Sequence, residues 1–222
     1  GVNATINGVS VGKGANSVAG NTVLGETALD ASVTGGNNTA IGKSALTTNT
    51  SGQRNTATGS FALDANTTGD DNTSMGSSAL GANTTGSDNV AIGQAALLVN
   101  STASNNTAVG YRSLFSNTTA NNNTAVGSSA LKENTTGQQN VAVGASALDA
   151  NTTANNNVAV GMNSLGGTTT GSSNVAVGSQ SLRTNSTGTQ NSAVGNEALL
   201  NNTTASNNTA FGHVALTANT TG

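Results

Sequence analysis

The sequence contains no cysteine, proline or tryptophan, and only 2% of its 222 residues are aromatic. The missing cysteine excludes disulfide staples and thiolate metal sites. Charged residues are also scarce, at 7% against about 25% in an ordinary globular domain. Six lysines and arginines in a chain of net charge −3 form no basic stripe, so we predict no nucleic-acid partner. No apolar run approaches the roughly 18 residues of a membrane span, so we predict no membrane insertion.

What the chain does contain is a strict tandem repeat. A seventeen-residue frame begins at Asn21 and recurs without insertion or deletion at residues 38, 55, 72, 89, 106, 123, 140, 157, 174, 191 and 208. In all twelve repeats position 5 is Gly and position 9 is Leu, and in eleven of them position 4 is bulky and apolar. A period this strict indicates a solenoid or a repeat array.

We therefore predict an all-β fold in which residues 21–222 form a parallel β-solenoid, or β-roll, of about twelve 17-residue coils. The β-branched segment before the invariant Gly predicts one short strand, and the Ala-Leu pair at positions 8 and 9 predicts a second. Residues 1–20 lie mostly outside the repeat. Val9 and Val11 alternate with small polar residues, which indicates a cap or the strand by which the chain enters the solenoid.

The repeat at 123–139 illustrates the role expected of each position. Val126 and Leu131 are predicted to form the core, and Gly127 and Gly137 the corners. Asn134, like the Asn that opens the repeat, is predicted to stack in a ladder. Every Asp, Glu, Lys and Arg inside the repeats falls at position 6, 7, 10, 11, 16 or 17, so these positions are predicted to face water.

The thin core of each coil predicts association between chains. Burying one Leu and one Val contributes roughly 1.5–3 kcal/mol each, whereas ordering a coil costs on the order of 25 kcal/mol. Additional burial between chains would supplement this core, and the small residues at positions 3 and 8 would let neighbours approach closely. We therefore expect a homotrimer with a threefold axis along the solenoid.

Two known repeat families resemble these residues. Asn-Thr-Ala-Val-Gly followed by Ala-Leu and Asn-Thr-Thr-Gly is similar to the repeats of phage tail-fibre and virion structural proteins. The pentapeptides at 89–93 and 140–144 also resemble the head repeats of trimeric autotransporter adhesins. The resemblance implies a structural fibre shaft or filament segment, extracellular or on a virion surface, that is adhesive toward a cell-surface glycan or receptor. Ligand contacts would then involve variable edge residues such as Phe61, Tyr111 and Phe115.

No constellation of catalytic residues stands out, so we expect neither an enzyme nor a cofactor. His213 is the only histidine and falls at an edge position, which is typical of a surface residue. Asp70, Asp71 and Asp88 suggest a calcium site, but this cluster does not recur along the repeats, so we predict no metal.

Position 12 leaves two alternatives open. It is followed two residues later by Thr or Ser, which makes a glycosylation sequon of each of ten asparagines: Asn49, Asn66, Asn83, Asn100, Asn117, Asn134, Asn151, Asn185, Asn202 and Asn219. The same residues also make a good turn with a stacked Asn ladder.

Two other functional alternatives follow from the repeat itself. The Thr rows at positions 13 and 14 leave room for an ice-binding solenoid. End-to-end stacking of coils would instead make the chain the subunit of a self-assembling filament.

Overall fold

The computed structural model describes residues 4–221, so the predicted cap is seen only from Ala4 onward. The predicted fold is confirmed: the chain is an all-β parallel solenoid with one short strand in every seventeen-residue repeat. By its internal contacts it divides between Asn106 and Thr107 into two compact units. Of the helices formed by residues 4–221, none has the length and apolar character needed to cross a membrane.

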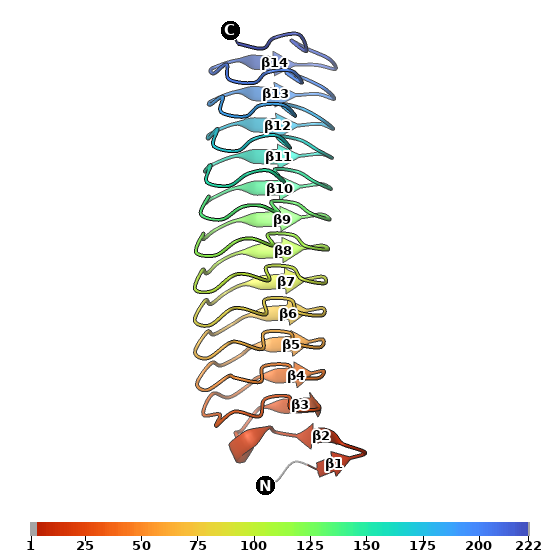
Figure 1. The fold of residues 1–222 in the computed structure, drawn as a ribbon, viewed down its shortest axis with the longest axis vertical. Helices are drawn as coiled ribbons and strands as arrows, with labels where there is room; N and C mark the ends of the chain where they lie inside the picture. Colours follow the sequence, from red (N-terminus) through yellow and green to blue (C-terminus); the bar gives the residue numbers. More distant parts are fainter. Residues whose placement is uncertain (1–3, 222) are drawn as a thin grey trace. The chain divides into compact units, whose positions relative to one another are not determined.

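The first unit begins with an antiparallel hairpin. Strands β1 (Ala4–Ile6) and β2 (Val9–Gly12) pair across a left-handed turn at Asn7 and Gly8. Strand β2 also pairs antiparallel with the first repeat strand, β3 (Thr22–Gly25), and a 3-10 turn at Ala15–Ser17 lies between them in sequence. From β3 onward each strand pairs in parallel with the next at an offset of seventeen residues (Figure 1): β4 (Thr39–Ile41), β5 (Thr56–Thr58), β6 (Thr73–Met75) and β7 (Val90–Ile92).

The second unit repeats this parallel stacking without a hairpin. Its strands pair with one another in the same seventeen-residue register (Figure 1): β8 (Thr107–Val109), β9 (Thr124–Val126), β10 (Val141–Val143), β11 (Val158–Val160), β12 (Val175–Val177), β13 (Ser192–Val194) and β14 (Thr209–Phe211). The pairing aligns equivalent residues, so Val141 lies opposite Thr124 and Val158. Each side chain is therefore repeated at about 4.8 Å along the stack.

The three-residue strands bury their middle residue rather than their last. In β9, Ala125 is fully buried whereas Val126 is 36% exposed. Side chains alternate along a strand, so positions 2 and 4 point outward when position 3 points inward. The prediction that Val126 belongs to the core is therefore wrong. The alanines at positions 3 and 8 lie inside each coil and are not available as a face for a neighbouring chain.

The wall opposite the strand is a turn rather than a second strand. Leu131 is fully buried, as are the equivalent leucines of ten other repeats, so the leucine half of the predicted core is confirmed. However, φ is +58° at Ser129 and +51° at Leu131, and this left-handed backbone is incompatible with an extended strand. The prediction of a second strand at positions 8 and 9 is wrong for this reason. A small Ala at position 3 leaves room for the Leu that crosses the narrow interior.

Backbone hydrogen bonds join each coil to both of its neighbours. In the coil at 123–139, the Leu131 and Thr124 N–H groups donate to carbonyls of the following coil, at 2.9 and 2.8 Å. The Ser129 N–H donates instead to the Tyr111 carbonyl of the preceding coil, at 2.9 Å. The turn is therefore bonded between coils almost as regularly as the strand, which satisfies backbone groups that the interior would otherwise leave unpaired.

The two predicted glycine corners differ in their physical cause. Gly127 has φ +139°, and a Cβ there would lie 2.5 Å from the Gly144 carbonyl oxygen, so both its conformation and its space require Gly. Gly137 has no positive φ. A Cβ on Gly137 would instead press against the Ala154 carbonyl and lie 2.6 Å from Asn134 Oδ1. The left-handed residue of this second corner is Gln139, at position 17.

Candidate functional site

The interior of each coil contains a polar network as regular as its leucine core. The first Asn is buried in eleven of the twelve repeats, and its side-chain oxygen accepts the backbone N–H of the corresponding Asn in the next coil, as Asn21 does from Asn38 and Asn191 from Asn208. Asn140 N donates to Asn123 Oδ1 at 3.0 Å, and Asn123 Nδ2 donates to the Gly137 carbonyl at 2.9 Å. The predicted asparagine ladder is thus present and links consecutive coils through buried amides.

A second ladder runs through position 12. Asn134 Nδ2 donates to Asn117 Oδ1 in the preceding coil at 2.9 Å and to the Gly137 carbonyl at 3.0 Å. The Gly137 carbonyl therefore accepts from both ladders. One carbonyl in each coil ties the two rows together, which explains why Asn rather than another turn residue occupies position 12.

This geometry opposes the expectation of a glycan row along one edge. Nine of the ten sequon asparagines are fully buried, and Asn219 is half-buried. A glycan is attached to Nδ2, the atom that donates the ladder hydrogen bonds. In the folded coil a modified Asn134 would lose one of the two bonds and place a bulky group in the interior. Glycosylation of position 12 would therefore be incompatible with an intact ladder.

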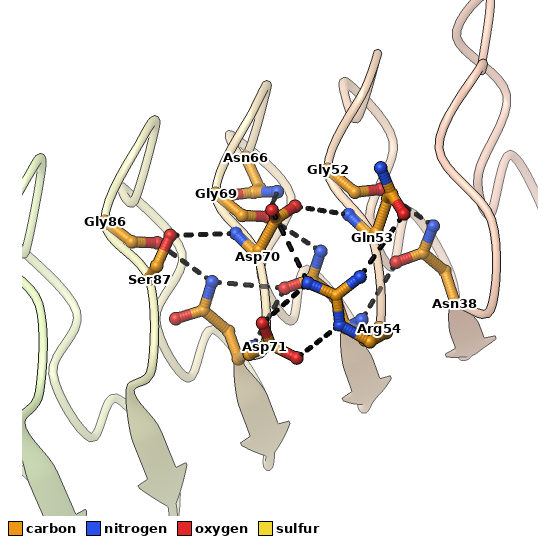
Figure 2. A network of polar contacts seen from close by, with 12 residues as sticks. Asn38, Gly52, Gln53, Arg54, Asn66, Gly69, Asp70, Asp71, Gly86 and Ser87 are labelled. Atoms are coloured by element: carbon orange, nitrogen blue, oxygen red, sulfur yellow. Dashed lines mark hydrogen bonds and ion pairs between the residues drawn. The ribbon is translucent and has the colours of Figure 1, made fainter.

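The charged pairs lie at the predicted edges. Arg54 Nε and Nη2 donate to the two oxygens of Asp71 at 2.7 and 2.8 Å, and Asp70 Oδ1 accepts the Gln53 N–H (Figure 2). The hydrogen bond from Arg54 lowers the pKa of Asp71 below its ordinary value. Both carboxylate oxygens of Asp71 therefore accept hydrogen bonds from Arg54. Among residues 4–221, no three His, Asp or Glu side chains lie close enough together to hold a metal ion.

Phe61, Tyr111, Phe115 and His213 lie at the edge positions that the sequence predicts for them. The Arg112 guanidinium lies over the rings of Tyr111 and Phe115, at 5.5 and 4.9 Å from their centroids. Tyr111 and Phe61 are exposed, whereas Phe115 is half-buried. His213 is also exposed.

The Thr rows do not form the free array that ice binding would require. The hydroxyl at position 13 donates to a backbone carbonyl of the next coil, as Thr135 Oγ1 does to Thr152 at 3.0 Å. These hydroxyls are half-buried structural donors. Position 14 is exposed but lies in the turn, as Thr136 does.

A group of residues at positions 10 and 11 was not singled out from the sequence. In the second unit, Asp149, Gly166 and Arg183 occupy position 10 of three successive coils and line an open depression together with Asn163, Gly167 and Thr184. Burial raises the pKa of the Asp149 carboxyl. The signal in the sequence is Gly166-Gly167-Thr168, which replaces the usual pair of side chains and Asn at positions 10 to 12.

No family model, curated protein or solved structure matches the chain.

Proposed function

We propose that the chain is a structural fibre segment, extracellular or on a virion surface, which acts mechanically and associates with copies of itself. The observation that carries this proposal is an uncovered apolar surface on strands β10, β11 and β12. Positions 2 and 4 are valine in all three of these strands. We call this surface the valine face, which consists of Val141, Val143, Val158, Val160, Val175 and Val177.

The valine face lies on the outward side of the sheet. Val143, Val175 and Val177 are 36–37% exposed, and the other three valines are half-buried. No repeat has a charged residue at position 2 or 4, so no lysine or carboxylate discourages contact with another sheet. A contiguous apolar surface on an otherwise polar protein marks an interaction site.

The repeat favours a second copy of the same chain as the partner. A neighbouring copy presents the same side chains at the same spacing of about 4.8 Å, so two faces match coil by coil. Closed rotational symmetry about an axis along the stack gives every copy an identical environment. We expect three copies, because a threefold arrangement covers the outward sheet of each chain along one shared axis.

A self-assembling filament is the second candidate. Equivalent strands pair in parallel in one seventeen-residue register, as β9 does with β10. Coils of different copies would stack end to end by continuing this register.

The test is sedimentation velocity combined with negative-stain microscopy of the purified chain. We expect discrete trimers, and Val143→Glu should dissociate them to monomers with an unchanged circular dichroism spectrum. Gln138→Glu, an equally charged change at an exposed edge position, should leave the trimer intact. Long filaments insensitive to Val143→Glu would favour the second candidate. A wild-type monomer at all concentrations would refute both.

A further inference from the structure

One coil departs from the repeat at three consecutive positions. In the coil at 157–173, Gly166 and Gly167 remove both side chains from positions 10 and 11, and Thr168 replaces the ladder Asn. The missing side chains leave an open depression of about 510 Å³ at this edge of the second unit. We call it the Gly166 depression, and it is lined by Asp149, Asn163, Gly166, Gly167, Arg183 and Thr184.

The change at Thr168 interrupts the ladder beneath the depression. In other coils the Oδ1 of the position-12 Asn accepts from the next Asn, as Asn134 does from Asn151 at 2.7 Å. Within residues 4–221, Asn151 Oδ1 and Thr168 Oγ1 are the two buried side-chain atoms that find no hydrogen-bond partner. Such atoms destabilise the fold. A local departure that weakens the coil without improving its packing is typical of a functional site.

Opposite charges flank the glycine floor of the depression. Asp149 Oδ1 lies 3.4 Å from the place where a Cβ on Gly166 would be, so its carboxylate is next to the glycine backbone at the bottom of the depression. Arg183 lies one coil beyond Gly166, and Asp149 one coil before it. The backbones that carry the two charges are thus about 10 Å apart, at two coil spacings.

Arg183 is left without a carboxylate partner. Its Nη1 donates to Gln180 Oε1 at 3.1 Å, and it forms none of the ion pairs found among residues 4–221. A guanidinium of this kind presents further donors in a planar fork that matches a carboxylate.

The first unit contains an internal comparison. Asp64 and Gly81 repeat the arrangement of Asp149 and Gly166, with Asp64 Oδ1 3.2 Å from the position of a Gly81 Cβ. There, however, Leu98 occupies the place of Arg183, and its Cδ1 lies 3.1 Å from the same point. The leucine fills the space that Arg183 leaves open. The Asp-Gly pair therefore has a structural role of its own, and the open, charged depression depends on Gly167 and Arg183, where the first unit has Ala82 and Leu98.

We propose that the Gly166 depression binds a sugar residue that carries a carboxylate, such as a hexuronic acid. Arg183 pairs with the carboxylate of the sugar. Asp149 accepts hydrogen bonds from ring hydroxyls, and the Asn163 amide both donates and accepts. The glycine floor lets the ring lie against the backbone, because no Cβ projects there. This site does not depend on the oligomeric state proposed above.

The experiment is a ligand titration of the full chain by two-dimensional NMR with glucuronic acid, glucose and acetate. We expect glucuronic acid to shift the amide signals of Gly166 and Gly167 with a dissociation constant in the roughly millimolar range expected for so small a ligand. Glucose and acetate each retain half of the interactions and should bind at least about tenfold more weakly. Equal binding of acetate would reduce the site to an anion site, and equal binding of glucose would refute the role of Arg183.

Two variants and a control separate binding from folding. Arg183→Gln should weaken glucuronic acid binding about tenfold or more while leaving the weak glucose response unchanged. Gly166→Val should abolish binding of both sugars by filling the floor, and Gly166 has no positive φ to forbid a side chain. Arg112→Gln, in the same unit but outside the depression, should bind like the wild type. If both site variants are folded by circular dichroism and still bind glucuronic acid normally, the proposal is wrong.

Discussion

In eleven of the twelve repeats the leucine at position 9 combines an unfavourable backbone with complete burial. Its φ is between +46° and +53° in every repeat, a left-handed conformation that costs an L-residue about 1–2 kcal/mol. Burying the side chain contributes roughly 1.5–3 kcal/mol, which offsets that cost. Leucine is thus retained for its size and apolar surface rather than for its backbone preference, and the core of each coil depends on this one residue.

Truncating this leucine should therefore destabilise the chain far more than truncating the valine at position 4. Leu131→Ala should lower the free energy of unfolding by about 2–5 kcal/mol because it leaves a cavity. Val126→Ala should cost less than about 1 kcal/mol because Val126 is 36% exposed. Urea denaturation of both variants under conditions that keep the oligomeric state constant measures the difference. Equal losses would place Val126 in the core after all.

The half-buried carboxyl of Asp149 should contribute to the free energy of unfolding at low pH, and this contribution should fall as pH rises. Burial raises its pKa above the ordinary value of 3.8, so the folded chain binds this proton more tightly than the unfolded chain. The resulting stability is complete below the unfolded pKa and is lost as pH rises through the folded pKa. Asp149→Asn should remove this contribution, as measured by urea denaturation between pH about 3 and 7.

Asp71 provides the comparison of opposite sign. Its pKa is lowered by the hydrogen bond from Arg54, so its contribution is present above the unfolded pKa and is lost as pH falls through the folded pKa. Asp71→Asn should therefore flatten the acidic limb of the same profile. A shared direction for both variants would contradict the assigned environments.

At the scale of the element, the turn and the strand are joined by amides rather than by apolar contacts alone. Ten of the twelve coils contribute one Asn to each of the two ladders, and in the coil at 123–139 both amides donate to one carbonyl at position 15. Buried networks of this kind stabilise only when every member is paired. The Asn ladder therefore fixes the register of successive coils, and its interruption at Thr168 is its weakest point.

Repairing that interruption should stabilise the chain. Thr168→Asn supplies the Nδ2 that Asn151 Oδ1 lacks, and we expect a gain of about 1–2 kcal/mol in the free energy of unfolding. The reverse change, Asn134→Thr, should copy the interruption into an intact coil and cost at least as much. Chemical denaturation of both variants measures these effects. No gain from Thr168→Asn would show that the two unpaired atoms are satisfied by water.

These elements also mark what the sequence could predict. The period, the invariant Gly127 and Leu131 and the segregated charges were enough to predict the solenoid, the corners and the solvated edges. The outward orientation of Val126 was not predictable from hydrophobicity, because Ala125 and Val126 are both apolar. Only the structure shows that the interior is so narrow that it accommodates Ala125 rather than Val126. The turn at positions 8 and 9 is not recognisable from the sequence, because leucine gives no signal of a positive φ. The Gly166 depression was not predictable from the sequence, because only the structure shows that the Arg183 side chain leaves this space open.

At the scale of the molecule, each unit is a stack in which a coil bonds to the coils before and after it. The hydrogen bonds of the coil at 123–139 reach residues 107–121 on one side and residues 140–156 on the other. Stability in such an array is close to a sum over coils and their interfaces. The unit that evolution or an experimenter can add or remove is therefore a whole coil of seventeen residues.

Deleting one whole coil should leave the fold intact, whereas deleting part of one should not. Removing residues 123–139 joins Asn122 to Asn140 and keeps both Asn ladders, the leucine row and the strand register continuous. We expect an unchanged circular dichroism signal per residue and a thermal midpoint lowered by only a few degrees. Removing residues 123–131 instead brings a half-coil against complete neighbours, so buried asparagines lose their partners and the β signal should drop. If the nine-residue deletion were as stable as the seventeen-residue deletion, coil register would not be what holds the stack together.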